Sequence, residues 1–434
     1  MRKLLIIPIF LVQSVFALNV KTIKDIEQYH GTADQIFVTD FKEGGVFYPY
    51  AGSRKEDGGV IIKDGSGRLW QRHYDVSNGV NPWWWQAKGD GVNDDLIAFN
   101  KMAAYVTMNG TFGENRGEEF SRPKIFIPDG IFRITGQWKV VGGSPVNGTD
   151  AVLYQCGPSY HAPSFKINEW IKSGSSLPVN IECSGRAFIW GDFKATELTA
   201  IVSYSALAYA YGGVSEQTAS IKGLNILGRH KQDHNFIGDD TKQIGLLVMG
   251  SKRISFENCS FYGLQYGMVH NMAYFSTISQ NFFGNCATGF FTMGSHSSTG
   301  MMLSADHCNL GFEFISGACS WTQVSGEQCK RAMQVAGNNT IFNGGYLEQL
   351  DKTSGNNDFQ VHVGYPAGHP FNKQSRVTGI TFNNLLIVGK NAVLIDNGVL
   401  DVTFSGATAS GRNVNKNPSA KIFSGGIEFS TKTQ

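Results

Sequence analysis

Two carboxylic acids, Asp306 and Glu327, stand at the same place in a short segment that recurs through the middle of the chain. The segment opens with an apolar residue and closes, five positions later, with a ring or a sulfur. Its copies are FENCSF (256–261), ISQNFF (278–283), LSADHC (303–308), VSGEQC (324–329) and IFNGGY (341–346). We expect the fourth positions of these segments to form one column, made of Cys259, Asn281, Asp306, Glu327 and Gly344.

Such a column would place the two acids on consecutive parallel strands. Neighbouring strands lie about 4.8 Å apart, so Asp306 and Glu327 should be close neighbours. Their repulsion should favour a state in which one is protonated and the other is ionised. Glycoside cleavage needs this arrangement, because one group protonates the leaving oxygen while the other attacks the sugar or activates water. The spacing leaves both retention and inversion of configuration open.

Other side chains near this column suit a sugar site. Glu348, two residues past the fifth segment, is a reserve acid that would give a wider gap to Asp306 or Glu327. The candidate substrate-binding residues are Trp321 and Tyr346, which offer flat apolar faces, and His307, Gln323 and Arg331, which can bond to hydroxyls or to an acidic sugar. The alternative is a solvated surface on which Arg331 neutralises Glu327 and Trp321 covers a loop.

The recurrence itself predicts the fold. A period near twenty residues with short β-type segments is typical of a solenoid, in which stacked turns share one core. Four of the segments continue into a small residue followed by apolar residues, at Gly267, Gly289, Gly311 and Ala332. We therefore expect an all-β fold, a right-handed parallel β-helix, with a small N-terminal mixed α/β leader and a capping helix.

The capping helix should follow the run KGDGVNDD (88–95), because helical spacing of apolar residues begins at Leu96. Asp90, Asp94 and Asp95 are expected to cap this helix rather than to hold a metal. The triplet Trp83–Trp85 is expected to cover the open end of the solenoid, with a sugar platform as the alternative.

These motifs support a family resemblance. The run 88–95, the helix after it and the turn Ile127–Gly130 resemble the start of the pectate-lyase-like β-helix superfamily. With DGG (57–59) and LWQR (69–72), the chain resembles bacteriophage tailspikes and capsular polysaccharide depolymerases within that superfamily. The resemblance covers 44–135 by motif and most of 220–410 by repeat. It implies polysaccharide binding or cleavage, often by a homotrimer. The calcium-binding Asp cluster of pectate lyases is not recognisable in this sequence.

Composition excludes several partners. The chain has 434 residues, 17% of them charged, and a formal net charge of +2. We expect no nucleic-acid partner, because a nucleic-acid-binding domain would carry a basic stripe. The seven cysteines contain no CxxC pair. We expect Cys308 and Cys329 to be core thiols in the interior column of Phe261 and Phe283, with a disulfide between them as the alternative. No cofactor or metal site is expected.

The expected organisation has four parts. Residues 1–17 carry Arg2 and Lys3 before an apolar run and a small-residue end, which predicts a cleaved signal peptide and a secreted protein. The apolar run is too short to span a membrane, and no other span is expected. A leader (18–82), a β-helix domain (83–410) and a C-terminal tail (411–434) follow. A secretion signal is unusual for a phage structural protein and favours a secreted bacterial enzyme or a prophage-derived relative.

These features favour an endo-acting glycosidase that cuts a bacterial capsular or extracellular polysaccharide. Two alternatives remain open. One is a polysaccharide lyase on the same fold, with Arg331, His307 or Tyr346 as base or neutraliser. The other is a carbohydrate-binding adhesin without catalysis. The first is favoured because carboxylates, rather than a basic cluster, recur in register.

Overall fold

The computed structural model of the protein describes residues 16–108, 123–142, 179–206, 219–230, 241–249, 253–271, 273–349, 358–365 and 376–431. The chain divides into two compact units. The first contains the chain up to Asp75 together with Trp83–Gln86, and the second contains Val76–Pro82 and the chain from Ala87. The expected signal segment, 1–17, lies outside the described residues except for its last two positions.

The first unit is a small mixed α/β fold, as the sequence predicts. Its strands form a sheet in the order β1-β2-β3-β5-β4. The elements are β1 (Ala17–Val20), α1 (Ile23–Glu27), β2 (Gln35–Val38), β3 (Gly45–Tyr50), β4 (Ile61–Lys63) and β5 (Leu69–His73), and two 3-10 turns follow, η1 (Val76–Asn78) and η2 (Pro82–Trp85). Buried Ile26, Phe47 and Trp70 belong to its core, so this unit has an apolar centre of its own.

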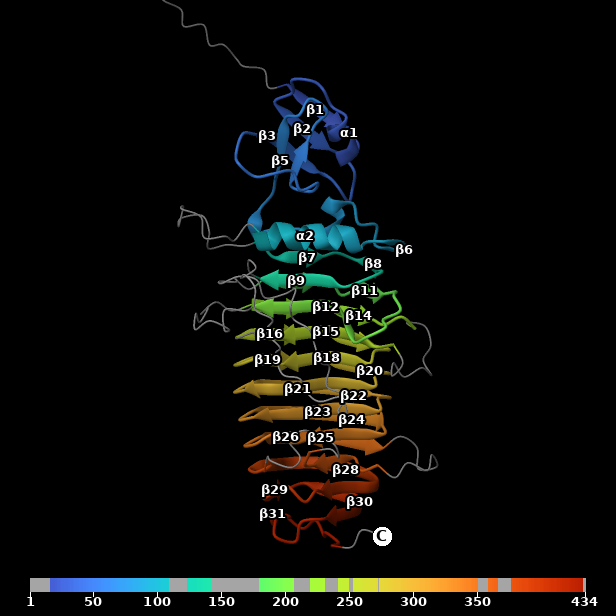
Figure 1. Ribbon diagram of the computed structural model, residues 1–434, viewed down its shortest axis with the longest axis vertical. Helices are drawn as coiled ribbons and strands as arrows, with labels where there is room; N and C mark the ends of the chain where they lie inside the picture. Colours follow the sequence, from blue (N-terminus) through green and yellow to red (C-terminus); the bar gives the residue numbers. More distant parts are fainter. Residues whose placement is uncertain are drawn as a thin grey trace, which may run out of the picture. The chain divides into compact units, whose positions relative to one another are not determined.

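The second unit is a right-handed parallel β-helix, which confirms the predicted fold class. Its strands stack in chain order from β7 to β31 (Figure 1). The first face contains β7 (Ile125–Ile127), β10 (Ile181–Cys183), β13 (Ala219–Lys222), β16 (Ile254–Glu257), β19 (Thr277–Ser279), β29 (Asp401–Ser405), β31 (Lys421–Phe423) and the first parts of β22 (Thr299–Asp306), β24 (Ser320–Cys329), β26 (Ile341–Gln349) and β28 (Ile380–Ile395).

The other two faces complete each turn of the solenoid. The second face contains β6 (Asp90–Asp94), β8 (Gly130–Ile134), β11 (Ala187–Gly191), β14 (Asn225–Leu227), β17 (Ser260–Tyr262), β20 (Phe282–Gly284), the later parts of β22, β24 and β26, the middle of β28 and the start of β30 (Thr408–Asn415). The third face contains β9 (Trp138–Gly142), β12 (Thr199–Ala206), β15 (Gln243–Met249), β18 (Tyr266–Asn271), β21 (Thr288–His296), β23 (Leu310–Gly317), β25 (Arg331–Val335), β27 (Val361–Val363) and the ends of β28 and β30. Because β30 and β31 pair in parallel with β28 and β29, the solenoid continues past residue 410.

A column of small residues lets the turns approach closely at the start of the third face. A Cβ atom added to Gly267 would lie 2.5 Å from the carbonyl oxygen of Gly289, and one added to Gly289 would lie 2.5 Å from that of Gly311. Side chains at these positions would force the stacked backbones apart. The small residues that follow the repeated segments are therefore a requirement of stacking, as the sequence suggests.

Helix α2 (Leu96–Met108) packs on the first turns of the β-helix, which confirms the predicted capping helix. Phe99 of this helix lies with its ring 5.3 Å from Phe132 and 4.9 Å from Trp138. The tryptophan triplet has contacts within the first unit, and its expected role as a cover stays a prediction. Arg72 lies 4.5 Å from the Trp84 ring, and Trp85 donates a hydrogen bond from Nε1 to a carbonyl oxygen, both within the first unit.

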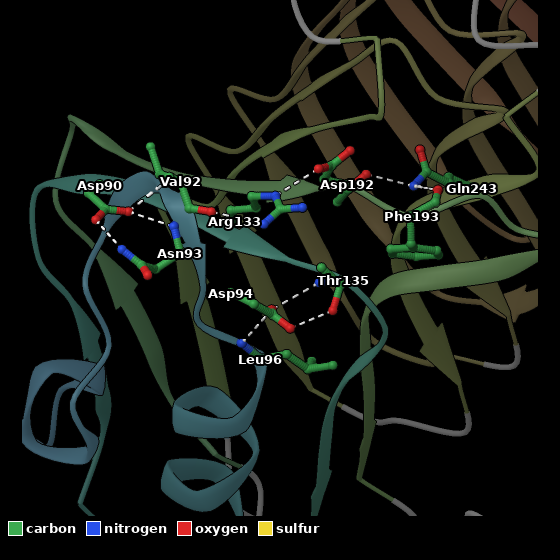
Figure 2. A network of polar contacts seen from close by, with 11 residues as sticks. Asp90, Val92, Asn93, Asp94, Leu96, Arg133, Thr135, Asp192, Phe193 and Gln243 are labelled. Atoms are coloured by element: carbon green, nitrogen blue, oxygen red, sulfur yellow. Dashed lines mark hydrogen bonds and ion pairs between the residues drawn. The ribbon is translucent and has the colours of Figure 1, made fainter.

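Among the described contacts, Asp94 alone of the three aspartates before α2 caps the helix with its side chain. Asp90 and Asp95 bind backbone N–H groups that precede the helix, which corrects the expectation that all three are caps. Asp90 Oδ1 accepts hydrogen bonds from the N–H groups of Val92 and Asn93, each 2.9 Å long, and Asp94 accepts one from Leu96 (Figure 2). Buried Asp95 accepts from the N–H groups of residues 88 and 89. The backbone hydrogen bonds from Asn93 and Val92 lower the pKa of Asp90 to about 2.

The strand register corrects two details of the predicted columns. Asp306 pairs with Gly284 rather than with Asn281. Phe261 pairs with Phe283, but Phe283 pairs with Ala305 rather than with Cys308. Cys308 instead lies against Cys286 and Cys329. The pKa of the Cys308 thiol is raised well above its usual value, and burial is the largest cause of this shift. These thiols are core residues, as predicted, but in a different column. All cysteines in the described ranges are free.

A buried histidine should make folding sensitive to acid. His270 is fully buried, and Nδ1 lies 3.3 Å from Thr292 Oγ1 and 3.2 Å from Ser295 Oγ. Burial lowers the pKa of His270 to about 3, against about 6.5 in an unfolded chain. Between these two pKa values the imidazole is protonated in the unfolded state and neutral in the folded state. The free energy of unfolding should therefore fall as the pH decreases from about 6.5 toward about 3.

We expect the wild type to lose about 2–3 kcal/mol more unfolding free energy than a His270→Gln variant between pH 7 and pH 4.5. Urea unfolding of both proteins at the two pH values measures this difference. The carboxylates titrate in both proteins, so their contribution to the unfolding free energy cancels in the difference. An equal loss in the two proteins would contradict the prediction.

Candidate active site on the second face

Asp306 and Glu327 project from the second face of the solenoid. Asp306, the last residue of β22, pairs in register with Glu327 of β24, which confirms the predicted neighbourhood. The preceding residues, Ala305 and Gly326, are buried, and strand alternation therefore directs both acids outward. The Asp306 side chain is 40% exposed, and Glu327 is also exposed. Strand spacing places their Cα atoms about 4.8 Å apart.

Both acids keep oxygen atoms available to a ligand. Asp306 Oδ1 lies 2.8 Å from Nδ1 of His307, the next residue in the chain. Glu327 Oε1 accepts a hydrogen bond of 3.1 Å from the hydroxyl of Ser325. Among the described residues, neither acid forms an ion pair with a lysine or an arginine. Two acids without a permanent cation on an exposed face can therefore engage a sugar.

Glu348 adds a third acid on the next strand, β26. Tyr346 of the same strand pairs in register with Ser325. A hydrogen bond between the Tyr346 hydroxyl and Glu348 raises the pKa of Tyr346, and the charges of Glu348 and Glu327 act in the same direction. Tyr346 and Glu348 are both partly exposed. The structure thus places three of the predicted acids on consecutive strands of one face, with Tyr346 beside them.

Two aromatic residues on this face were not identified from the sequence. The register runs from Tyr262 of β17 through Gly284 of β20 to Asp306. Burial raises the pKa of Tyr262, and the charge of Asp306 contributes to the shift. Phe282 lies beside it, with ring centroids 5.3 Å apart. Tyr262 directly follows the first repeated segment, so strand alternation was the available signal for its outward orientation.

Trp321 does not belong to this face, which corrects the sequence prediction. It has no exposed surface, and its ring lies 4.6 Å from Phe314 and 5.7 Å from Phe290 in the core. It pairs in register with Gly300 and Phe342. The ring is therefore unavailable to a sugar.

Arg331 and Gln323 lie at either side of the acids rather than among them. Arg331 is on β25 of the third face, where it donates to Asp358 Oδ1 at 3.1 Å and to Gln334 Oε1 at 2.8 Å. The alternative in which Arg331 neutralises Glu327 is therefore wrong, and so is the placement of Arg331 beside the acids as a sugar-binding residue. Gln323 is exposed and has a φ of 54°, at the bend where β24 passes from the first face to the second.

Another carboxyl group in the described part of the chain has a strongly raised pKa, but it lies on the third face. Burial raises the pKa of Glu313 on β23 to about 8, and the charge of Arg331 opposes this shift. Glu313 is only 5% exposed, so it cannot reach a polymer. In the described part of the chain, no group of three or more His, Cys, Asp or Glu residues has the arrangement of a metal site. None of the helices described is long and apolar enough to cross a membrane.

No protein-family model matches the chain, and no curated protein sequence matches it. Solved structures do match its fold. The enzymatically active domain of tailspike protein 2 of bacteriophage CBA120 superposes with a TM-score of 0.57 at 13% identity, over 92% of this chain and 51% of that one. The tailspike protein of Acinetobacter baumannii phage AM24 gives 0.55 at 13% identity, over 93% and 62%.

A bacterial protein matches as well. The glycan biofilm modifying enzyme of Pantoea stewartii, which has a bacteriophage tailspike-like parallel β-helix, gives a TM-score of 0.52 at 13% identity, over 91% of this chain and 48% of that one. This chain thus spans between 48% and 62% of the length of these proteins. At such identities the likeness establishes the fold. The chain has the parallel β-helix fold found in bacteriophage tailspike proteins.

Proposed function

We propose that the protein is a polysaccharide depolymerase, an endo-acting glycoside hydrolase that cuts a bacterial capsular or extracellular polysaccharide. The observation that carries this proposal is the register pairing of Asp306 with Glu327 on an exposed face. The fold supports it, because one similar structure is an enzymatically active tailspike domain and another is a glycan biofilm modifying enzyme.

The paired acids have complementary roles in this proposal. One carboxylic acid protonates the glycosidic oxygen as the bond breaks, and the other attacks the anomeric carbon or activates a water molecule. Carboxyl groups about 5–5.5 Å apart favour retention, and groups about 6.5–9.5 Å apart favour inversion. Asp306 with Glu327 gives the shorter separation. Asp306 with Glu348, two strands away, gives a wider one, since each strand adds about 4.8 Å.

An endo-acting enzyme fits the position of the acids. Strands continue on the second face both before β22 and after β26. A polymer lying across these strands can contact several of them at once, and the cleaved bond then lies in its interior.

A polysaccharide lyase is the second candidate, and the contact of His307 with Asp306 supports it. An imidazole held by a carboxylate can act as a base that removes a proton beside a uronate carboxyl group. Two observations weigh against it. The three acids would repel a uronate, and Arg331, the expected neutraliser, bonds to Asp358 on another face.

Digestion of a panel of bacterial capsular polysaccharides, exopolysaccharides and O-polysaccharides distinguishes these functions. We expect one polymer to become shorter while reducing ends increase and no ultraviolet-absorbing double bond forms. New absorbance with shortening would establish the lyase and contradict the hydrolase. Binding without shortening would establish the third alternative, a carbohydrate-binding adhesin.

The proposal also includes the oligomeric state and the secretion of the enzyme. The family resemblance supports a homotrimer, and the basic and apolar start of the sequence supports secretion through a signal peptide ending at Ala17. A phage or prophage origin is compatible with the fold. Sedimentation of the secreted protein and sequencing of its N-terminus test the two points, and a monomer or an intact Met1 would contradict them.

A further inference from the structure

The outward side chains around the acids follow an ordered pattern along the solenoid axis. Rings lie before the acids, at Tyr262 and Phe282, and after them, at Tyr346. Between these rings, the residues beside Asp306 and Glu327 are serines, Ser304 and Ser325, which pair in register with Phe282 and Tyr346 respectively. The acids are thus bordered by small side chains on their own strands and by aromatic rings on the strands beyond.

The ring of Tyr262 leans across the neighbouring strand. A Cβ atom added to Gly284 would lie 2.7 Å from Tyr262 Cδ1 and 3.0 Å from Phe282 Cε1. Gly284 lies between Tyr262 and Asp306 in the column, so the missing side chain gives the Tyr262 ring its place. A glycine within a strand often marks such a close approach. The influence of Asp306 on the phenol agrees with this placement.

The two rings before the acids form one exposed apolar surface. Tyr262 and Phe282 meet at an interplanar angle of 37°, and Tyr262 is 37% exposed. On the far side, Tyr346 pairs in register with Leu386, which is 41% exposed. Single exposed apolar residues are ordinary, but these two pairs border the same acids on the same face. Pyranose rings present an apolar face of C–H groups that packs on such surfaces, and aromatic rings provide large rigid contact area.

We propose that Tyr262 with Phe282, and Tyr346 with Leu386, are two sugar-stacking subsites that hold a glycan along the solenoid axis, with the cleaved bond between them over Asp306 and Glu327. The strands of Tyr262 and Tyr346 are separated by four strand spacings, about 19 Å. The substrate is therefore a glycan segment of several sugars with uncharged rings at both ends. This inference rests on the proposed function, and its test uses binding as well as cleavage.

The test measures binding in the inactive double variant Asp306→Asn/Glu327→Gln, using affinity electrophoresis in gels that contain the polysaccharides of the panel above. We expect Tyr262→Ala and Phe282→Ala each to weaken retention of the bound polymer about tenfold. Tyr262→Phe should keep most of the binding, because the ring remains. Gly284→Val should weaken it, because the new side chain displaces the Tyr262 ring.

Met301→Ala is the matched control, because Met301 is 48% exposed on the same strand as Asp306 but on the first face. It should bind as the parent does. In the active protein, Tyr262→Ala should raise KM with little change in kcat, since stacking remote from the bond is shared by the ground and transition states. Binding by the Tyr262 and Phe282 variants within twofold of the parent would overturn the subsites even if cleavage is observed. Weakened binding by the Tyr262 and Phe282 variants, together with no cleavage by the wild type, would support the stacking subsites and contradict the glycoside hydrolase.

Discussion

Replacing Asp306 by Asn, or Glu327 by Gln, should each reduce kcat by about a hundredfold or more while KM changes little. The physical reason is that each change removes a group that donates a proton or bonds to the reacting centre, and its contribution is made mainly in the transition state. The side chains are nearly isosteric and exposed, so the fold should be unaffected. Reducing-end kinetics on the cleaved polymer measure the effect, and circular dichroism checks folding.

The control for this experiment is Glu257→Gln. Glu257 lies on the first face, is partly exposed and pairs with Lys222 at 3.2 Å. It should retain full activity. The double variant Asp306→Asn/Glu327→Gln should lose little more than the worse single variant, because groups that act as a unit are not additive. If Glu348→Gln abolishes activity while Glu327→Gln does not, the pair is Asp306 with Glu348. Full activity in both single variants would move the site elsewhere.

Trp321→Ala should destabilise the protein by about 3–5 kcal/mol without a specific loss of polymer binding. Trp321 is fully buried between aromatic rings, and its indole fills the space left by Gly300, the register partner on β22. Removing the indole creates a cavity that the stacked turns cannot close easily. Urea unfolding measures the loss, and activity per folded molecule should remain near that of the wild type.

Phe423→Ala provides the comparison for an exposed ring. Phe423 is 65% exposed on β31, so its removal should change the unfolding free energy by about 0.5 kcal/mol or less. Trp321→Phe should lose less stability than Trp321→Ala, because it keeps part of the buried volume. A Trp321→Ala protein that is stable but no longer binds polymer would contradict the buried position and restore the sugar contact expected from the sequence.

The acid pair could be predicted because both partners follow the same local pattern. Asp306 and Glu327 each come one position after a small buried residue on strands with matching apolar positions. Their neighbours could not be predicted in the same way. Gly284, rather than Asn281, stands next to Asp306, because the first two repeated segments start on the first face and the next two on the second. Apolar residues have the same spacing on both faces, so the pattern does not distinguish them.

Bends in the strands explain why the predicted positions of Trp321 and Arg331 were wrong. Trp321 was predicted to offer a flat face to a sugar because it lies near the acid segments in the sequence, but alternation directs it inward and Gln323, at φ 54°, then turns the strand. Arg331 follows Glu327 by a few residues, yet the corner at Gln328, with φ 50°, carries it to the third face. Positive φ at a residue other than glycine is uncommon and has no strong sequence signal.

The sequence by itself determined that this chain is a stacked β-helix with a helical cap. Apolar alternation and small residues at regular intervals are local properties that each turn must satisfy to bury its inner side. Only the tertiary structure decided which side chains share a face: Tyr262 and Phe282 join the acids, while Trp321 and Arg331 leave them. The reason is that turns of unequal length still stack at one strand spacing, so neighbours across turns are set by hydrogen-bonded register rather than by distance along the chain.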